Sequence, residues 1–273
     1  MITPLVSIVT PVLNGERYIR QCLDSVAAQQ FLFLPGQVVG VVSTLEHIVV
    51  DGISSDGTMA ILADYQQKYS HLKIACEPAR GVGAAVNTGF EIAKGSVLGW
   101  IDSDDYYEPG AIQTVVDYFT AHPEAMLVYG GCKIVNDLGQ PFTEFPVPAA
   151  EGSRFIIKPF DEREAIEEWA YIVFCAAFYR REVIEAVGGF NDLGNDLDFW
   201  VRVNRKYPGG MHMISQTLTN WRLHRGGISM KRSPREAGIR LDRLKQDYFL
   251  AAKYGYNVLA PRPRRYLEAL KEG

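Results

Sequence analysis

Residues 97–105 read Val-Leu-Gly-Trp-Ile-Asp-Ser-Asp-Asp, so an apolar run ends in three carboxylates within four residues. The apolar part has the length and composition of a buried strand, and Pro109 marks the start of a helix behind it. Neighbouring carboxylates repel one another, and a bound cation is the usual way to neutralise them. Asp102, Asp104 and Asp105 therefore predict a site for Mg²⁺ or Mn²⁺, which prefer oxygen ligands and bridge phosphates. A helix N-cap is the alternative, but it needs only one carboxylate.

The same order of a short strand followed by a helix runs through the first half of the chain. We expect strands at 5–10, 47–50, 72–76, 97–101 and 125–129, with Asp56 capping the second helix. This alternation predicts a doubly wound, parallel α/β sheet. Ligands of such sheets bind outside the carboxyl ends of the strands. We therefore expect one rim to gather the polar residues that follow these strands, which are Asn14, Asp51, Glu77 and Asp102–Asp105.

The second half is less regular. It predicts a hairpin turn at 137–140, short helices at 181–187 and 199–203, a strand at 211–223 and a long helix at 234–254. Neither an internal repeat nor a low-complexity linker separates it from the first half. One continuous domain with a variable second half fits this pattern best.

Composition excludes several classes of protein. The 273 residues are 47% hydrophobic and 22% charged with a net charge of −4, which indicates a globular protein and argues against a nucleic-acid partner. The start of the chain has no basic leader, and the four cysteines are widely spaced, so we expect a cytoplasmic protein.

Positive charge is concentrated late in the chain. From Arg222 to Lys245 there are eight Lys and Arg residues against Glu236 and Asp242. Such a segment favours a phosphate-bearing partner, either a nucleotide or an anionic lipid surface. A solvated helix face is the alternative.

Three further patterns have more than one interpretation. Gly81-Val82-Gly83 opens a helix but lacks the third glycine and the acidic residue of a dinucleotide-binding fingerprint, so we reject a Rossmann dehydrogenase. Asp196 and Asp198 lie at the start of a helix, where one suits a cap and the other a general base. His224 ends a strand among basic residues, as a structural histidine or as a ligand of a metal or pyrophosphate.

Taken together and in order, these segments make the chain resemble the family 2 glycosyltransferases, which are inverting enzymes of the GT-A fold. The resemblance covers about residues 4–140 and resumes more weakly at 175–230. It is carried by VSIVTPVLNG at 6–15, HIVVDGISSDGT at 47–58, EPARG at 77–81, NTG at 87–89 and GWIDSDD at 99–105. The resemblance implies a single domain at 1–230, with a nucleotide-binding half to about 130 and an acceptor half beyond it. Residues 231–273 would form a basic helical extension.

The resemblance also implies roles in binding the donor. Pro11 and Asn14 would border the nucleotide, and Asp51 would accept a hydrogen bond from the nucleobase. Arg80 would contact the base or a phosphate. Asp102 would lie near the ribose.

Metal and catalytic roles follow in the same way. Asp102 and Asp104 match the family's DxD motif, with Asp104 holding the metal against the diphosphate and Asp105 supporting it. Asn195-Asp196 stands where relatives have Glu-Asp, so Asp196 would be the general base. His224 matches a histidine that joins the metal or pyrophosphate site in some relatives.

The expected function is transfer of a sugar from a nucleoside-diphosphate sugar to an acceptor hydroxyl with inversion, assisted by Mn²⁺ or Mg²⁺. The basic segment favours a glycan or lipid-linked acceptor near the inner face of a membrane, in cell-surface polysaccharide or glycolipid assembly. Two alternatives remain, a nucleotidyltransferase and a non-catalytic carbohydrate- or partner-binding protein. The sequence departs from the family pattern at Leu13, Ala84 and Asn195, and residues 31–44 look like an insertion.

Overall fold

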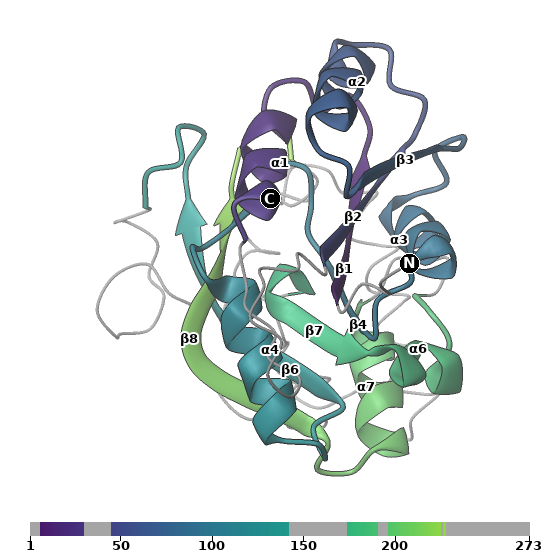
Figure 1. Cartoon of the computed structure of the whole chain (residues 1–273), viewed down its shortest axis with the longest axis vertical. Helices are drawn as coiled ribbons and strands as arrows, with labels where there is room; N and C mark the ends of the chain where they lie inside the picture. Colours follow the sequence, from purple (N-terminus) through teal and green to yellow (C-terminus); the bar gives the residue numbers. More distant parts are fainter. Residues whose placement is uncertain (1–5, 30–44, 142–173, 191–195, 225, 228–273) are drawn as a thin grey trace, which may run out of the picture.

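The computed structural model describes residues 6–29, 45–141, 174–190, 196–224 and 226–227. Within these ranges the strands form one eight-stranded sheet in the order β3-β2-β1-β4-β7-β6-β8-β5 (Figure 1). The sequence prediction of an α/β fold with a mostly parallel sheet is confirmed.

The first four strands alternate with helices as predicted. The elements in chain order are β1 (Val6–Val12), α1 (Ile19–Ala27), β2 (Leu45–Asp51), α2 (Thr58–Lys68), β3 (Leu72–Cys76), α3 (Val82–Ile92) and β4 (Val97–Trp100). β1 pairs in parallel with β2 and β4, and β2 pairs in parallel with β3. Every residue of β1, β2 and β4 is buried, as expected for parallel strands covered on both faces.

The rest of the sheet is mixed. Its elements are β5 (Tyr106–Tyr107), α4 (Ala111–Ala121), β6 (Leu127–Val135), the 3₁₀ turn η1 (Phe174–Ala176), β7 (Ala177–Arg180), α6 (Arg181–Val187), α7 (Asp196–Lys206) and β8 (Met211–Arg222). β7 runs antiparallel between β4 and β6, and β8 pairs in parallel with β6. β5 pairs antiparallel with β8, which brings the chain directly after the Asp102–Asp105 segment against the end of β8.

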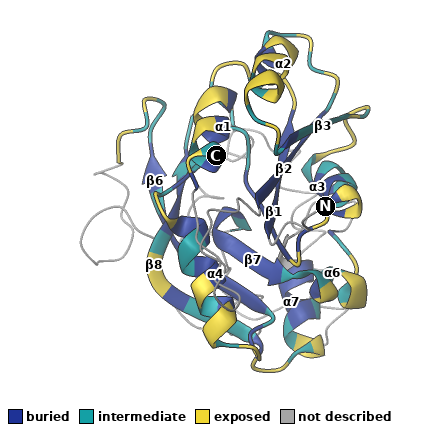
Figure 2. Ribbon diagram, in the orientation of Figure 1, coloured by how far each residue is buried: buried dark blue, intermediate teal, exposed yellow. Residues whose placement is uncertain are grey.

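The strands at the centre of the sheet are buried (Figure 2), and two apolar clusters pack against them. Residues of α1, α2 and α4 pack in one cluster, and residues of α3, α6 and α7 pack in the other. The alternation of side chains along β1 divides it between them, with Ile8 in the first cluster and Val9 in the second. Because helices cover both faces of the sheet, the ends of the strands are the place where polar side chains can gather.

Several predicted boundaries change. β6 runs to Val135 instead of 129, and α4 begins at Ala111 after Gly110, whose φ of 76° is left-handed. The N-cap of α2 is Gly57, so the prediction that Asp56 occupies this position is wrong. Asp56 still accepts a hydrogen bond from the Thr58 N–H at 3.0 Å, because it lies two residues before the first residue of the helix. The hairpin turn at 137–140 is confirmed, with the Asn136 N–H donating to the Gln140 carbonyl at 2.8 Å.

Some predictions lie outside the described residues. They are the insertion at 31–44, the helix at 234–254 and the basic extension at 231–273. Within the part of the chain that the structure does describe, each helix is too short or too polar to cross a bilayer.

Candidate functional site

A cavity of about 550 Å³ opens at the carboxyl ends of β1, β4 and β8. Pro11 and Asn14 line it from the end of β1, Asp102 and Asp104 from the end of β4, and His224 from the end of β8. The remaining lining comes mainly from the segments 12–18, 77–85 and 221–227. Asn14, Glu77, Asp102 and Asp104 of the predicted rim thus line one cavity, whereas Asp51 and Asp105 do not. The cavity volume falls in the range that holds a small-molecule ligand.

The carboxylate cluster stands at the centre of the candidate site. One oxygen from each of Asp102, Asp104 and Asp105 lies within 4.8 Å of the other two. The imidazole Nε2 of His224 lies 2.8 Å from Oδ2 of Asp104, and the two side chains are only 11% and 26% exposed. Three carboxylates with an adjacent imidazole form a donor set that suits a hard divalent cation such as Mn²⁺ or Mg²⁺.

Asp105 differs from its two neighbours because it is 1% exposed and does not line the cavity. The backbone N–H of Arg222 donates to its Oδ1 at 2.8 Å, and its Oδ2 lacks a hydrogen-bond partner among the described residues. Burial, followed by the charges of Asp104 and Asp102, raises the pKa of Asp105 well above its usual value. A nearby cation would offset this cost, so the buried carboxyl also fits a metal site.

Arg222 is a residue whose role sequence reasoning missed. We counted it in the basic segment, yet it is 3% exposed. Its Nε donates to the Asp104 carbonyl at 2.9 Å and its Nη2 to Gln21 Oε1 at 2.6 Å. Its Nη1 donates to the carbonyls of Asn136 and Asp137 at 3.1 and 2.9 Å. Arg222 therefore joins the carboxylate turn to α1 and to the hairpin turn after β6. Its position between Trp221 and Leu223 in a strand-like run was the available signal.

Hydrogen bonds join the loop after β1 to the loop after β2. Asn14 adopts a φ of 53°, its side-chain Oδ1 accepts from the Ser55 N–H at 2.8 Å, and its own N–H donates to Ser54 Oγ at 2.8 Å. Ile53, with a φ of 66°, is the other non-glycine residue at positive φ in the described ranges. A β-branched residue in this region is strained, and such strain is concentrated at ligand sites.

The structure places two predicted binding residues away from the cavity surface. Asp51 is fully buried, and its two carboxylate oxygens accept from the Ser54 N–H at 2.8 Å and the Ser54 hydroxyl at 2.6 Å. The Arg80 side chain is 66% exposed and pairs with Glu77 at 3.2 Å. Glu77 itself lines the cavity and accepts from the Thr88 hydroxyl at 3.0 Å. The sequence predicts Glu77 on this rim but assigns it no role.

The two candidate bases lie on α7. Asp196 is the first residue of this helix, and its side chain lies outside the described part of the chain. Asp198 is 2% exposed, and Arg202 Nε donates to its Oδ2 at 2.8 Å. Arg202 also donates to the carbonyls of Val187 and Gly189. Asp198 thus belongs to an internal ion pair that anchors α7 to the end of α6.

The fold is that of solved GT-A glycosyltransferases. S. aureus TarS 1–349, solved with UDP-GlcNAc, aligns with a TM-score of 0.58 and 19% identity over 84% of this chain and 62% of that chain. The mannosyltransferase PcManGT from Pyrobaculum calidifontis, solved with GDP-Man and Mn²⁺, aligns with a TM-score of 0.57 and 18% identity over 96% of this chain and 67% of that one. The architecture of this chain is thus the GT-A fold.

The model of Glycosyl transferase family 2 matches residues 7–188, so this chain belongs to that family. A curated relative, the chondroitin synthase of Escherichia coli, is 24% identical over 264 residues. The alignment covers 96% of this chain, and the chain spans 34% of the relative's length.

Proposed function

We propose that this protein transfers a sugar from a nucleoside-diphosphate sugar to an acceptor hydroxyl with inversion of the anomeric centre. The observation that carries the proposal is the joint presence of Asp102, Asp104 and His224 at one cavity of about 550 Å³. The solved neighbours named as complexes with UDP-GlcNAc and with GDP-Man support a nucleotide-sugar donor. The family match favours this function over nucleotidyl transfer.

Asp102 and Asp104 would hold a divalent cation, Mn²⁺ or Mg²⁺, with Asp105 behind them. Such an ion offsets the charge that develops on the leaving diphosphate. His224 orients Asp104 through its 2.8 Å contact and lies close enough to join the ion or the pyrophosphate. Arg222 keeps the turn that carries Asp104 in place, because its guanidinium binds the Asp104 carbonyl.

The donor's nucleoside would lie against the loops after β1, β2 and β3. Pro11 and Asn14 form the β1 side of the cavity, and Glu77 contributes a carboxylate from the β3 side. We propose that Asp51 acts here by holding the 52–54 loop through Ser54, and that Arg80 reaches the donor by leaving its exposed pair with Glu77.

Asp196 is our candidate for the general base that removes the proton from the acceptor hydroxyl. The internal ion pair of Asp198 with Arg202 supports this choice, because it gives Asp198 a structural role. Proton removal during attack on the face opposite the leaving diphosphate produces inversion in one step.

We also propose a glycan or lipid-linked acceptor in cell-surface polysaccharide or glycolipid assembly. The relative named chondroitin synthase supports a polysaccharide product. Contact with the inner face of a membrane would come from the basic segment after Arg222, since Arg222 itself is internal. Sedimentation with anionic vesicles tests this part, and equal recovery with neutral vesicles would contradict it.

The transfer itself is tested by offering a panel of nucleoside-diphosphate sugars with simple glycan acceptors and Mn²⁺. Release of nucleoside diphosphate that requires an acceptor, together with an NMR assignment of the new linkage as inverted, would support the proposal. A retained configuration would contradict inversion. Absence of turnover with each donor would favour the non-catalytic binding protein.

A further inference from the structure

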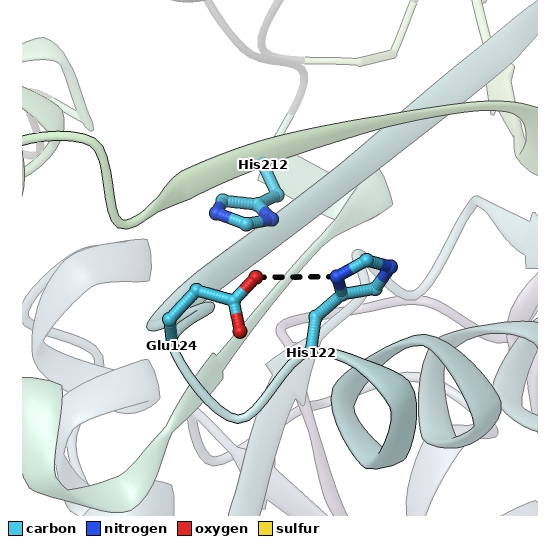
Figure 3. Close-up of side chains that lie close together, drawn as sticks. All are labelled: His122, Glu124 and His212. Atoms are coloured by element: carbon cyan, nitrogen blue, oxygen red, sulfur yellow. Dashed lines mark hydrogen bonds and ion pairs between the residues drawn. The ribbon is translucent and has the colours of Figure 1, made fainter.

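Figure 3 shows a group of three side chains, His122, Glu124 and His212, whose ligand atoms lie close together near the start of β8. His122 is the C-cap of α4, Glu124 lies in the turn before β6, and His212 is the second residue of β8. One ligand atom from each lies within 4.8 Å of the others. His224 at the carboxylate cluster is twelve residues from His212 along the chain. At a rise of about 3.3 Å per residue along the strand, the two groups are separated by roughly 30 Å or more of chain path.

The hydrogen bonds of His212 determine which ring nitrogen carries the proton and how the ring is oriented. Its Nε2 lies 3.2 Å from the Gly209 carbonyl, which can only accept, so Nε2 carries the proton. Its Nδ1 is therefore unprotonated and accepts a hydrogen bond from the Tyr118 hydroxyl at 3.2 Å, which a bound metal ion would replace. Donation of the second ring N–H to a backbone carbonyl is the arrangement that orients histidines in metal sites.

Glu124 and His122 complete the group on the solvent side. Nδ1 of His122 lies 3.2 Å from Oε1 of Glu124, and their side chains are 42% and 62% exposed. The Glu124 side chain is the more exposed of the two, so a metal ion arriving from solvent would reach this carboxylate first.

Tyr118 holds the two imidazoles in place. It stacks on His122 with ring centroids 4.2 Å apart and meets His212 edge-on at 5.9 Å. The backbone is fixed as well, because the N–H groups of Met126 and Leu127 donate to the Gly210 carbonyl beside His212. Neighbouring contacts therefore hold both imidazoles, and the exposed Glu124 side chain is the ligand with the most freedom to adjust.

We propose that His122, Glu124 and His212 form a second divalent-metal site, which takes Zn²⁺ and leaves a fourth position open to solvent. Two imidazoles and a carboxylate are a ligand set that Zn²⁺ prefers, whereas Mg²⁺ prefers oxygen ligands alone. Zinc bonds of about 2.0–2.1 Å require the ligand atoms to close to roughly 3.5 Å, a modest movement for Glu124. The ion would tie the end of α4 to the start of β8.

Calorimetric titration of Zn²⁺ into tag-free, EDTA-stripped protein tests this site. We expect one binding equivalent to be lost in Glu124→Gln and in His212→Asn, and to be kept in Asp104→Ala, which alters the carboxylate cluster. His71→Asn is the matched control, because His71 lies outside both groups and should keep full binding. Glu124→Gln changes an exposed side chain, so a folding defect would not explain its loss.

Thermal unfolding gives a second readout that does not depend on sugar transfer. Zn²⁺ at about 100 times its dissociation constant should raise the unfolding midpoint of the parent protein and of Asp104→Ala by several degrees. The Glu124→Gln and His212→Asn variants should not show this rise. The same zinc stoichiometry and affinity in Glu124→Gln and His212→Asn as in the parent protein would overturn the proposal, as would no zinc binding at all.

Discussion

The part of the chain up to Val135 and the part after Phe174 contribute to the cavity in different ways. In the first part, side chains reach the cavity because each follows its own strand, as Asn14 follows β1 and Asp104 follows β4. Among its described residues, the second part lines the cavity with 221–224 and 226–227, which arrive there because β8 pairs with β6 and β5. The first contribution is local in sequence, whereas the second depends on contacts between distant segments.

This difference identifies the contacts on which the geometry of the site depends. The carboxylates of the first part depend on Arg222 and His224 of the second part for their position. Substitutions in either part should therefore lower metal-dependent activity. They should differ in their effects on kcat, on metal affinity and on the free energy of unfolding.

The largest effect is expected from Asp196→Asn in the second part. Loss of a general base lowers kcat by about 10²–10⁴-fold while nucleotide binding persists. Steady-state kinetics and nucleotide titration measure the two properties separately.

Asp198→Asn is the matched control for this experiment. It breaks a buried ion pair and should lower the free energy of unfolding by about 3 kcal/mol. Full kcat in Asp196→Asn would remove Asp196 from the mechanism.

In the first part, Asp104→Ala should lower kcat/KM by about 10²–10³-fold, since it removes a charged group that stabilises the developing diphosphate charge. The loss should persist at high Mn²⁺ concentration. Asp56→Ala, a change of a half-buried carboxylate just before α2, serves as the comparison. Equal activity of the two variants would contradict a metal role for Asp104.

Arg222→Lys tests the connection between the two parts. Lysine keeps the charge but cannot reproduce the four hydrogen bonds that the guanidinium makes to Asp104, Asn136, Asp137 and Gln21. We expect the free energy of unfolding to fall by about 2–3 kcal/mol and the apparent metal affinity to fall with it. Urea unfolding and Mn²⁺ titration check both. An unchanged metal affinity would show that Arg222 acts on stability alone.

His224→Asn should have a smaller effect on the same site. Loss of a side chain that orients a metal ligand reduces metal affinity or activity by about 10–100-fold. Dependence of the rate on Mn²⁺ concentration measures this change. A normal Mn²⁺ dependence would limit His224 to a structural role.

The smallest effect concerns His47, inside the first part. Burial lowers the pKa of His47 to about 3, and its Nε2 contacts Thr10 Oγ1 at 2.9 Å. Below pH 6.5 the unfolded chain binds a proton that the folded protein excludes, so stability falls as the pH drops. Between pH 6.5 and pH 5 the loss should be about 2 kcal/mol, and His47→Gln should reduce it. Urea unfolding at several pH values gives the slope, and an unchanged slope in the variant would contradict the assignment.

The sequence predicted the first part well, because strand and helix periods are local properties. Strands β1 to β4 and the convergence of Asn14, Asp102 and Asp104 on one rim follow from the alternation and from the rule for parallel sheets. The helix at Arg181–Val187 was also predicted with its bounds.

The remaining features depend on long-range packing. The insertion of β7 between β4 and β6 and the burial of Arg222 are set by contacts that the residue pattern does not record. Asp51 illustrates the same limit. Its place directly after the expected strand at 47–50 predicted a rim position. In the structure it is the last residue of β2, and its carboxylate accepts hydrogen bonds from Ser54 that support the loop.

The most direct test of the account is thermal unfolding with UDP, GDP and dTDP, each with Mn²⁺, with Mg²⁺ or with EDTA. One nucleotide with a metal ion should raise the unfolding midpoint by several degrees at about 100 times its dissociation constant. The rise should disappear in EDTA and in Asp104→Ala. A rise that survives both treatments, or no rise with any of the nucleotides, would contradict a metal–diphosphate site at this cavity.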